Sequence, residues 1–119
     1  MISFLKKYVN KFRYAFGGLF HGITHDRSIF LQCLIAVCVI IVFAFFHLTM
    51  IEWVIVLILI GSIIALEFIN SAIETIVDFI SPEYNEKAKI MKDYAAAAVL
   101  VMSIVAAVVG LMILKGKLW

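Results

Sequence analysis

The sequence predicts an all-α membrane protein in which a basic surface helix precedes three transmembrane helices. The first observation is composition: 66% of the 119 residues are hydrophobic, and the mean hydropathy is +1.14. A soluble fold of this length lacks the interior volume to bury so much apolar surface. The second is the presence of three apolar stretches long enough to cross a bilayer. The third is a basic, aromatic segment ahead of them.

The surface helix is predicted within residues 1–28. Its first half mixes apolar and aromatic residues with four basic ones, Lys6, Lys7, Lys11 and Arg13. It has no continuous apolar core followed by a small-residue cleavage site, so we do not expect a cleavable signal peptide. The pattern favours a helix lying at the headgroup boundary. A frayed cytosolic tail is the alternative.

The three transmembrane helices are predicted at residues 29–48, 53–80 and 90–114. Backbone hydrogen bonds must be closed within each segment in lipid, which requires helices there. The connections are short, so consecutive helices should be antiparallel neighbours. We therefore expect one domain covering residues 1–119.

The basic residues predict the orientation in the membrane. Eight of the ten lie before the first span or between the last two, and the remaining two, Lys115 and Lys117, follow the third span. Basic residues concentrate in cytoplasmic segments. The N-terminus and the connection around residues 81–93 should therefore face the cytoplasm. The small net charge of +2, without a basic aromatic patch, argues against a nucleic-acid partner.

One face of the second span carries acids and amides. Glu67, Asn70, Ser71, Glu74 and Asp78 recur at intervals that place them together on a helix of about 3.6 residues per turn. Ionisable residues in a membrane are costly and usually mark function. A cluster of interhelical hydrogen bonds that only holds helices together is the alternative.

The depth of these residues indicates their chemistry. Glu67 lies fourteen residues after Trp53, about 21 Å along the helix and still within the hydrocarbon on its cytoplasmic side. Glu74 is a further ~10 Å along and reaches the interface. A carboxylate there suits Mg²⁺ with phosphate, and the deeper one could accept a proton from a lipid hydroxyl. With Lys92 beside Asp93, this is a credible frame for phosphoryl transfer.

The same residues carry a family resemblance. The run from Glu67 to Asp78, with Ser81-Pro-Glu83-Tyr84 and the later Lys92-Asp93, resembles the prokaryotic diacylglycerol kinase family. The resemblance implies a lipid kinase that uses ATP and Mg²⁺, and a homotrimeric helical bundle with active sites shared between protomers. Its membrane substrate would be a lipid alcohol. The turn and the short N-terminus look more like the undecaprenol kinase branch, which favours undecaprenol over diacylglycerol.

The resemblance also implies roles for individual residues. Glu67 would be the general base and Asn70 would orient the reacting groups, with Asp78 supporting the polar face. Glu74 and Asp26 would bind metal and ATP. The family usually has Glu where this chain has Asp26, so that contact could be lost or made through water, and a helix N-cap is the alternative. The remaining ATP-binding positions would be Lys7, Tyr14, Glu83, Tyr84, Asn85, Lys92 and Asp93.

Two other classes of function stay open at this point. A non-enzymatic membrane protein, such as a small channel or transporter subunit, could use the acidic face as an ion path. An inactive family member is the other alternative, motivated by Asp26 and by Phe30, which occupies a position that is frequently basic in the family.

Overall fold

The computed structural model describes residues 1–119 as four helices and no strand. They are α1 (Ile2–His25), α2 (Arg27–Ala44), α3 (Met50–Ile80) and α4 (Glu86–Leu118). The last three are long and apolar enough to cross a membrane, which confirms the all-α class and the three apolar helices. The 18 residues of α2 span about 27 Å. The 31 residues of α3 span about 46 Å, so α3 reaches beyond the hydrocarbon.

Local capping decides where the helices begin. The Thr49 side chain accepts a hydrogen bond from the Glu52 backbone N–H, and the Glu52 carboxylate accepts one from the Thr49 N–H, which forms a complete capping box for α3. At the start of α4 the Asn85 side chain alone forms the cap, accepting from the backbone N–H groups of Lys87 and Ala88. α2 ends at Ala44, and the turn to α3 holds His47 at a positive φ of 53°.

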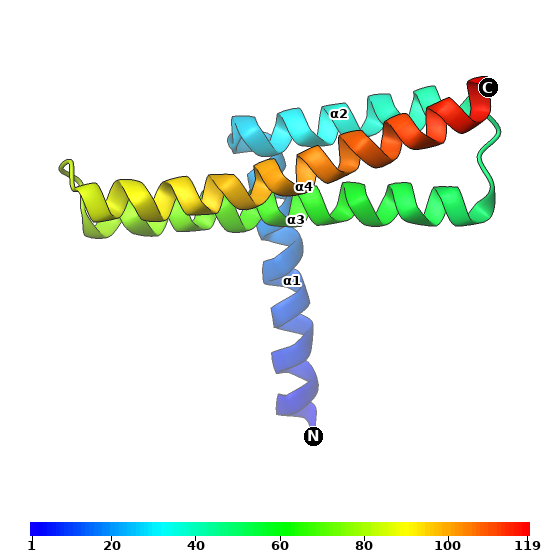
Figure 1. The fold of residues 1–119 in the computed structure, drawn as a ribbon. Coiled ribbons are helices and arrows are strands. Elements are labelled where there is room, and N and C mark those ends of the chain that lie inside the picture. The colour runs from blue at the N-terminus through cyan, green and yellow to red at the C-terminus, as the bar shows by residue number, and fades with distance from the viewer.

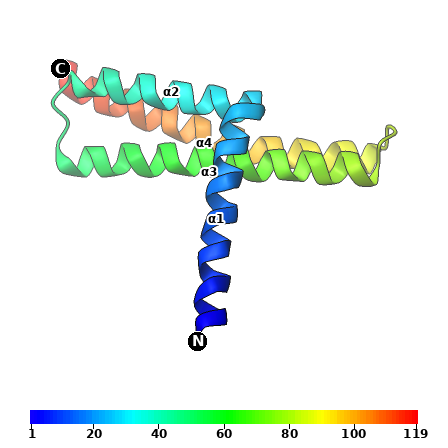
Figure 2. The same ribbon diagram turned by 180° about the vertical axis from the view of Figure 1, so that it is seen from behind.

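Helices α2, α3 and α4 form a three-helix bundle, and α1 projects away from it. Figures 1 and 2 show α3 and α4 running antiparallel along their length, with α2 beside them only in the half nearer the C-terminus. Both views show α1 projecting steeply away from the other three, starting near the middle of α3. The ends of α3 and α4 that meet at residues 81–85 therefore extend past the point where α1 departs.

The junction of α1 with the bundle depends on Gly22. A Cβ atom at this position would clash with the ring of Phe68 on α3 and would lie 3.2 Å from Cδ1 of Ile29. Ile29 is itself buried, at 2% exposure. The absence of a side chain at Gly22 thus allows the α1–α2 elbow to pack closely against α3, and it sets Asp26 beside the acidic face of that helix.

The core of the single chain is small. At the end of the bundle opposite the 81–85 turn, Phe43, Val56 and Ile113 form a buried cluster, and Lys117 pairs with Glu52 at 2.7 Å. Only 11 of 119 residues are buried, while large apolar side chains on every helix are exposed. Lipid or further protein must cover that surface, which agrees with a membrane protein. The place of α1 at the membrane surface and the trimer stay predictions.

Candidate active site

The predicted base, Glu67, lies in the middle of α3 and is only 7% exposed. Its Oε1 atom accepts a hydrogen bond of 3.3 Å from Nε2 of Gln32 on α2. Its other oxygen, Oε2, is buried and has no protein partner, and the same is true of Oδ1 of Asn70 one turn along the helix. Two predicted catalytic side chains therefore each present a free acceptor in a buried position.

These free oxygens distinguish between two interpretations of the acidic face, a functional site and a cluster of hydrogen bonds that only holds helices together. A buried acceptor without a partner costs roughly 1–3 kcal/mol, and more for a charged group. A cluster that only held helices together would satisfy its acceptors within the protein. The arrangement therefore favours a site in which another molecule supplies the missing donors.

Asp26 caps α2, as the alternative interpretation predicted. Its Oδ1 accepts a hydrogen bond of 3.1 Å from the backbone N–H of Ile29, and its side chain lies beside Ser71 of α3, in a cavity shared with His21 and His25. Burial raises the pKa of Asp26, but interactions with the Ser71 hydroxyl and the backbone N–H groups of Ile29 and Ser28 outweigh it and hold the pKa below its ordinary value. Asp26 is thus an anion at neutral pH, and its neighbour Ser71 lies about one helical turn before Glu74 on α3.

The predicted phosphate-binding residues meet where α3 ends and α4 begins. The ammonium group of Lys92 donates a hydrogen bond of 2.8 Å to Oδ1 of Asp78 across the two helices. Glu74 and Asp93 also lie within electrostatic range of Lys92. Asp93 itself accepts a hydrogen bond of 2.7 Å from Lys89, four residues earlier on α4. Charges of both signs therefore alternate on an exposed surface.

The turn between α3 and α4 adjoins this surface. Glu83, Tyr84 and Asn85 line a cavity of about 420 Å³ together with Asp78 and Lys92. Tyr84 is 83% exposed, and the Ser81 hydroxyl donates to the Glu83 backbone carbonyl at 3.3 Å. The Asn85 side-chain oxygen is already used in capping α4, so its remaining amide N–H groups are the part available to a ligand.

Two predicted site residues lie apart from all of these. Lys7 and Tyr14 are on α1, and both are exposed. Measured along the helix from the Gly22 contact, they are about 22 Å and 12 Å away, in the direction in which α1 leaves the bundle (Figure 1). No three His, Cys, Asp or Glu side chains come together as a metal cluster. One chain alone therefore does not gather the whole predicted site.

Sequence reasoning missed Gln32. It lies in the apolar run Ile29–Ala36, where a long polar side chain is costly in lipid. That lone amide was an available signal, but its partner on α3 could not be read from periodicity. Ser71 was placed on the acidic face without a role, and the structure sets it beside Asp26.

Comparison with known proteins shows the family of this chain. Residues 13–114 match the profile of the family described as prokaryotic diacylglycerol kinase. The undecaprenol kinase of Bacillus subtilis is 34% identical over 114 residues, which cover 96% of this chain and 93% of that protein. The diacylglycerol kinase of Synechocystis is 35% identical over 83% of this chain and 57% of its own length. That of Haemophilus influenzae is 32% identical, covering 78% of this chain and 79% of its own length.

These relatives are lipid kinases, and three helices of this chain can span a membrane. The match to the family covers most of the sequence, including the whole acidic face and the Lys92-Asp93 pair. The chain is therefore a multi-pass membrane protein that belongs to the prokaryotic diacylglycerol kinase family.

Proposed function

We propose that this protein transfers the γ-phosphoryl group of ATP to the hydroxyl of a membrane lipid alcohol, with Mg²⁺ as cofactor, at the cytoplasmic face of the bacterial inner membrane. The observation that carries the proposal is Glu67. It is buried at 7% exposure, with one oxygen held by Gln32 and the other unpartnered. A carboxylate in this state is suited to accept a proton from a buried hydroxyl.

The reaction needs one proton acceptor and one electrophile. The lipid hydroxyl oxygen attacks the γ-phosphorus while its proton passes to Oε2 of Glu67. The bond from that phosphorus to the bridging oxygen of ADP breaks, and ADP leaves with the electron pair. Asn70, whose free Oδ1 lies one turn from Glu67, would orient the reacting groups.

The residues for Mg²⁺ fit the preferences of that ion. Asp26 is anionic and caps α2 with one oxygen, and Glu74 is exposed one turn beyond Ser71. Mg²⁺ in phosphoryl-transfer sites is bound by one or two carboxylates, with the other positions taken by phosphate and water. Asp26 and Glu74 would thus hold it, and the bound ion would neutralise charge on the phosphates.

The nucleotide is proposed to bind at the ends of α3 and α4. Asp78 and Asp93 position the ammonium group of Lys92 in the absence of nucleotide. On binding, Lys92 would exchange its bond to Asp78 for ATP phosphates. The exposed turn residues Glu83, Tyr84 and Asn85 would contact the nucleoside. Lys7 and Tyr14 complete the site from α1.

The distance of Lys7 and Tyr14 from the other site residues supports a shared site. α1 projects away from its own bundle (Figure 2), where a neighbouring protomer could receive it. We therefore propose a homotrimer in which α1 lies on the membrane surface and completes the active site of another copy. The exposed Phe4, Leu5 and Phe12 would face the lipid.

Undecaprenol is the proposed acceptor, in preference to diacylglycerol. The supporting observation is that the match to the Bacillus subtilis undecaprenol kinase extends over 96% of this chain and 93% of that protein. The matches to the two diacylglycerol kinases cover less of both chains.

The test is a conservative change of the base, Glu67→Gln, with Glu52→Gln as the matched control. Glu52 is an acid on the same helix but at its other end, beside Lys117. Transfer from radiolabelled ATP to undecaprenol in mixed micelles should fall about 10²–10⁴-fold for Glu67→Gln and stay near the unmodified level for Glu52→Gln. Retained phosphoryl transfer in Glu67→Gln would refute the assignment of Glu67 as the general base. Ion flux into proteoliposomes without ATP would favour the channel instead.

A further inference from the structure

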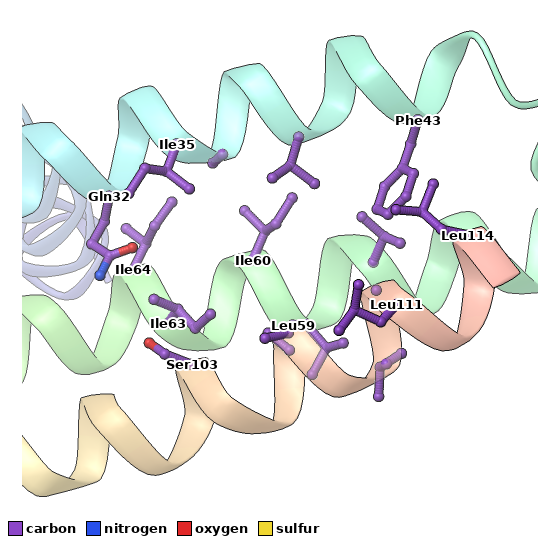
Figure 3. A pocket seen from close by; sticks show the side chains of 17 residues that line it. Gln32, Ile35, Phe43, Leu59, Ile60, Ile63, Ile64, Ser103, Leu111 and Leu114 are labelled. Atoms are coloured by element: carbon purple, nitrogen blue, oxygen red, sulfur yellow. The ribbon is translucent and has the colours of Figure 1, made fainter.

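A single amide side chain joins α2 to the proposed base. Gln32 is the only strongly polar residue between positions 29 and 44, and Figure 3 shows its side chain reaching from α2 toward α3. Its Nε2 donates a hydrogen bond of 3.3 Å to Oε1 of Glu67. Polar side chains within membrane spans are costly and usually serve a contact. The bond to Glu67 therefore accounts for a polar residue at this position.

The backbone around Gln32 is held in place by buried neighbours. Ile29 and Ala36 lie three residues before it and four residues after it, which puts all three on one face of α2. Both neighbours are buried, and Ile29 packs at the α1–α2 elbow beside Gly22. Gln32 thus extends toward Glu67 from a packed helix face rather than from a mobile surface.

The bond holds one oxygen of Glu67 and leaves the other free. A carboxylate rotates broadly about its last side-chain bond, so an unheld Glu67 would present its oxygens in many orientations. A donor on Oε1 selects one plane for the group. Oε2 lies in that plane, buried and without a protein partner. The same contact therefore determines which oxygen is available and where it points.

The chemistry of an amide suits this task. A glutamine side chain donates through its NH₂ group and carries no proton that titrates. Gln32 can therefore hold Oε1 without competing for the proton that the proposed reaction delivers to Oε2. A lysine or a second acid at this position would instead add another charge to a buried site.

The bond is weak as a link between helices. Its length of 3.3 Å lies beyond the usual range of about 2.7–3.2 Å for N–H···O bonds. Packing of buried apolar side chains, Ile29 at one end of α2 and Phe43 at the other, already joins this helix to the bundle. The contact therefore contributes more to the orientation of Glu67 than to the stability of the fold.

We infer that Gln32 is a positioning residue of the proposed kinase: its amide holds the Glu67 carboxylate so that Oε2 faces the lipid hydroxyl. The inference rests on the proposed function. Gln32 acts through Glu67 and takes no part in proton or phosphoryl transfer. A bond that only joins α2 to α3 is the alternative, and the two roles differ in which measured quantity changes when the donor is removed.

The first test removes the donor. Gln32→Met keeps an unbranched side chain of similar length, and Leu31→Met is the matched control, because Leu31 is the preceding residue and is 46% exposed. kcat and KM for undecaprenol and for ATP are measured in mixed micelles. kcat should fall about 10–100-fold in Gln32→Met, as for a misplaced catalytic group. Both KM values should stay within about twofold, and the thermal unfolding temperature should match that of Leu31→Met.

A donor of similar reach should restore the rate. Gln32→His places an N–H near the position of the glutamine amide, and at pH 8 the imidazole is neutral. Most of the kcat lost in Gln32→Met should return in Gln32→His. Equal losses of kcat in the two variants would overturn the role of the donor. An unchanged kcat with a lowered unfolding temperature in Gln32→Met would show a bond that only joins helices, and would also overturn the inference.

A double variant tests whether Gln32 acts through Glu67. Glu67→Gln leaves no base to position, so adding Gln32→Met should change the residual transfer from radiolabelled ATP by less than about twofold in a single-turnover assay. A further loss as large as that in Gln32→Met alone would place Gln32 on the substrate or nucleotide and overturn the inference. Loss of transfer in Glu67→Gln beside full activity in Gln32→Met would overturn it while leaving the kinase standing. Failure of the unmodified protein to phosphorylate a lipid would overturn the proposed function, and this inference with it.

Discussion

Lys92 of α4 and Asp78 of α3 are joined by a hydrogen bond of 2.8 Å at the end of the bundle that also carries the 81–85 turn. The two side chains are 37% and 63% exposed. An ion pair this exposed contributes little to stability. The pair holds an ammonium group beside Glu74 and Asp93, and in the proposed site a phosphate of ATP would replace Asp78.

Replacing Lys92 by Gln should therefore lower phosphoryl transfer strongly and raise KM for ATP, while the thermal unfolding temperature in detergent changes little. Asp78→Asn should also lower phosphoryl transfer and raise KM for ATP, but by less, because it removes only the carboxylate that positions the ammonium group of Lys92. Lys87→Gln serves as the control, because Lys87 is an exposed lysine on the same helix that lies outside this cavity. Equal losses in Lys87→Gln and Lys92→Gln would show a general charge effect instead.

Asp26 has two proposed tasks that different substitutions separate. Asn is as good an N-cap as Asp, whereas Ala is not. Asp26→Asn should keep the stability of α2 but raise the Mg²⁺ concentration needed for half-maximal activity. Asp26→Ala should do the same and also destabilise the protein by about 0.5–2 kcal/mol through loss of the cap to Ile29. An unchanged Mg²⁺ requirement in Asp26→Asn would show that Asp26 caps α2 and does not bind the metal.

Substitution of Asn70 by an apolar residue should stabilise the protein and lower its activity. Its Oδ1 is buried without a protein partner, so removal of the acceptor relieves a desolvation cost of about 1–3 kcal/mol. Asn70→Leu is expected to raise the thermal unfolding temperature while phosphoryl transfer falls. Both are measured on the same detergent preparation. A variant that loses stability and activity together would indicate a structural hydrogen bond rather than an acceptor reserved for substrate.

Gly22→Ala tests the docking of the α1–α2 elbow on α3. The new Cβ would clash with the Phe68 ring, and overpacking of this kind costs about 1–3 kcal/mol. Stability should fall, and the additional change Phe68→Leu should restore part of it. Gly17→Ala is the matched control, because nothing lies within 4 Å of a Cβ at that position. It should leave the protein unchanged or slightly more stable.

The shared site predicts complementation between inactive protomers. The double variant Lys7→Ala, Tyr14→Ala lacks the α1 contribution, and Glu67→Gln lacks the base. Each is expected to be inactive alone, but trimers reconstituted from a mixture should regain a measurable fraction of the unmodified activity, since some sites combine intact α1 with intact α3. A mixture no more active than its components would place α1 in the site of its own chain.

Much of this architecture was predictable from the sequence because it is periodic or local. The three apolar helices follow from hydrophobic runs, and the placement of Glu67, Asn70 and Glu74 on one face follows from helix geometry. The cap that Asp26 forms on α2 also follows from local sequence, since Asp directly before a helix is a common N-cap. Contacts between helices were not predictable in this way. The Gln32–Glu67 bond joins residues 35 positions apart, and the Gly22–Phe68 contact depends on how α1 crosses α3.

The departure of α1 from the bundle was also not predictable from local pattern. The sequence of α1 indicates a helix with basic and aromatic residues, but its direction is set by the elbow at Asp26 and by the packing of Gly22 against Phe68. Lys7 and Tyr14 are therefore distant from residues with which the family motif groups them.

Phosphorylation of a lipid alcohol by the purified, unmodified protein tests the central claim most directly. The protein is incubated in mixed micelles with ATP labelled in its γ-phosphate and either undecaprenol or dioleoylglycerol, with Mg²⁺ or with excess chelator, and the lipids are separated by thin-layer chromatography. The account predicts labelled undecaprenyl phosphate, formed faster than labelled phosphatidic acid and only with Mg²⁺. Absence of label in both lipids, from protein that is folded and oligomeric, would contradict it.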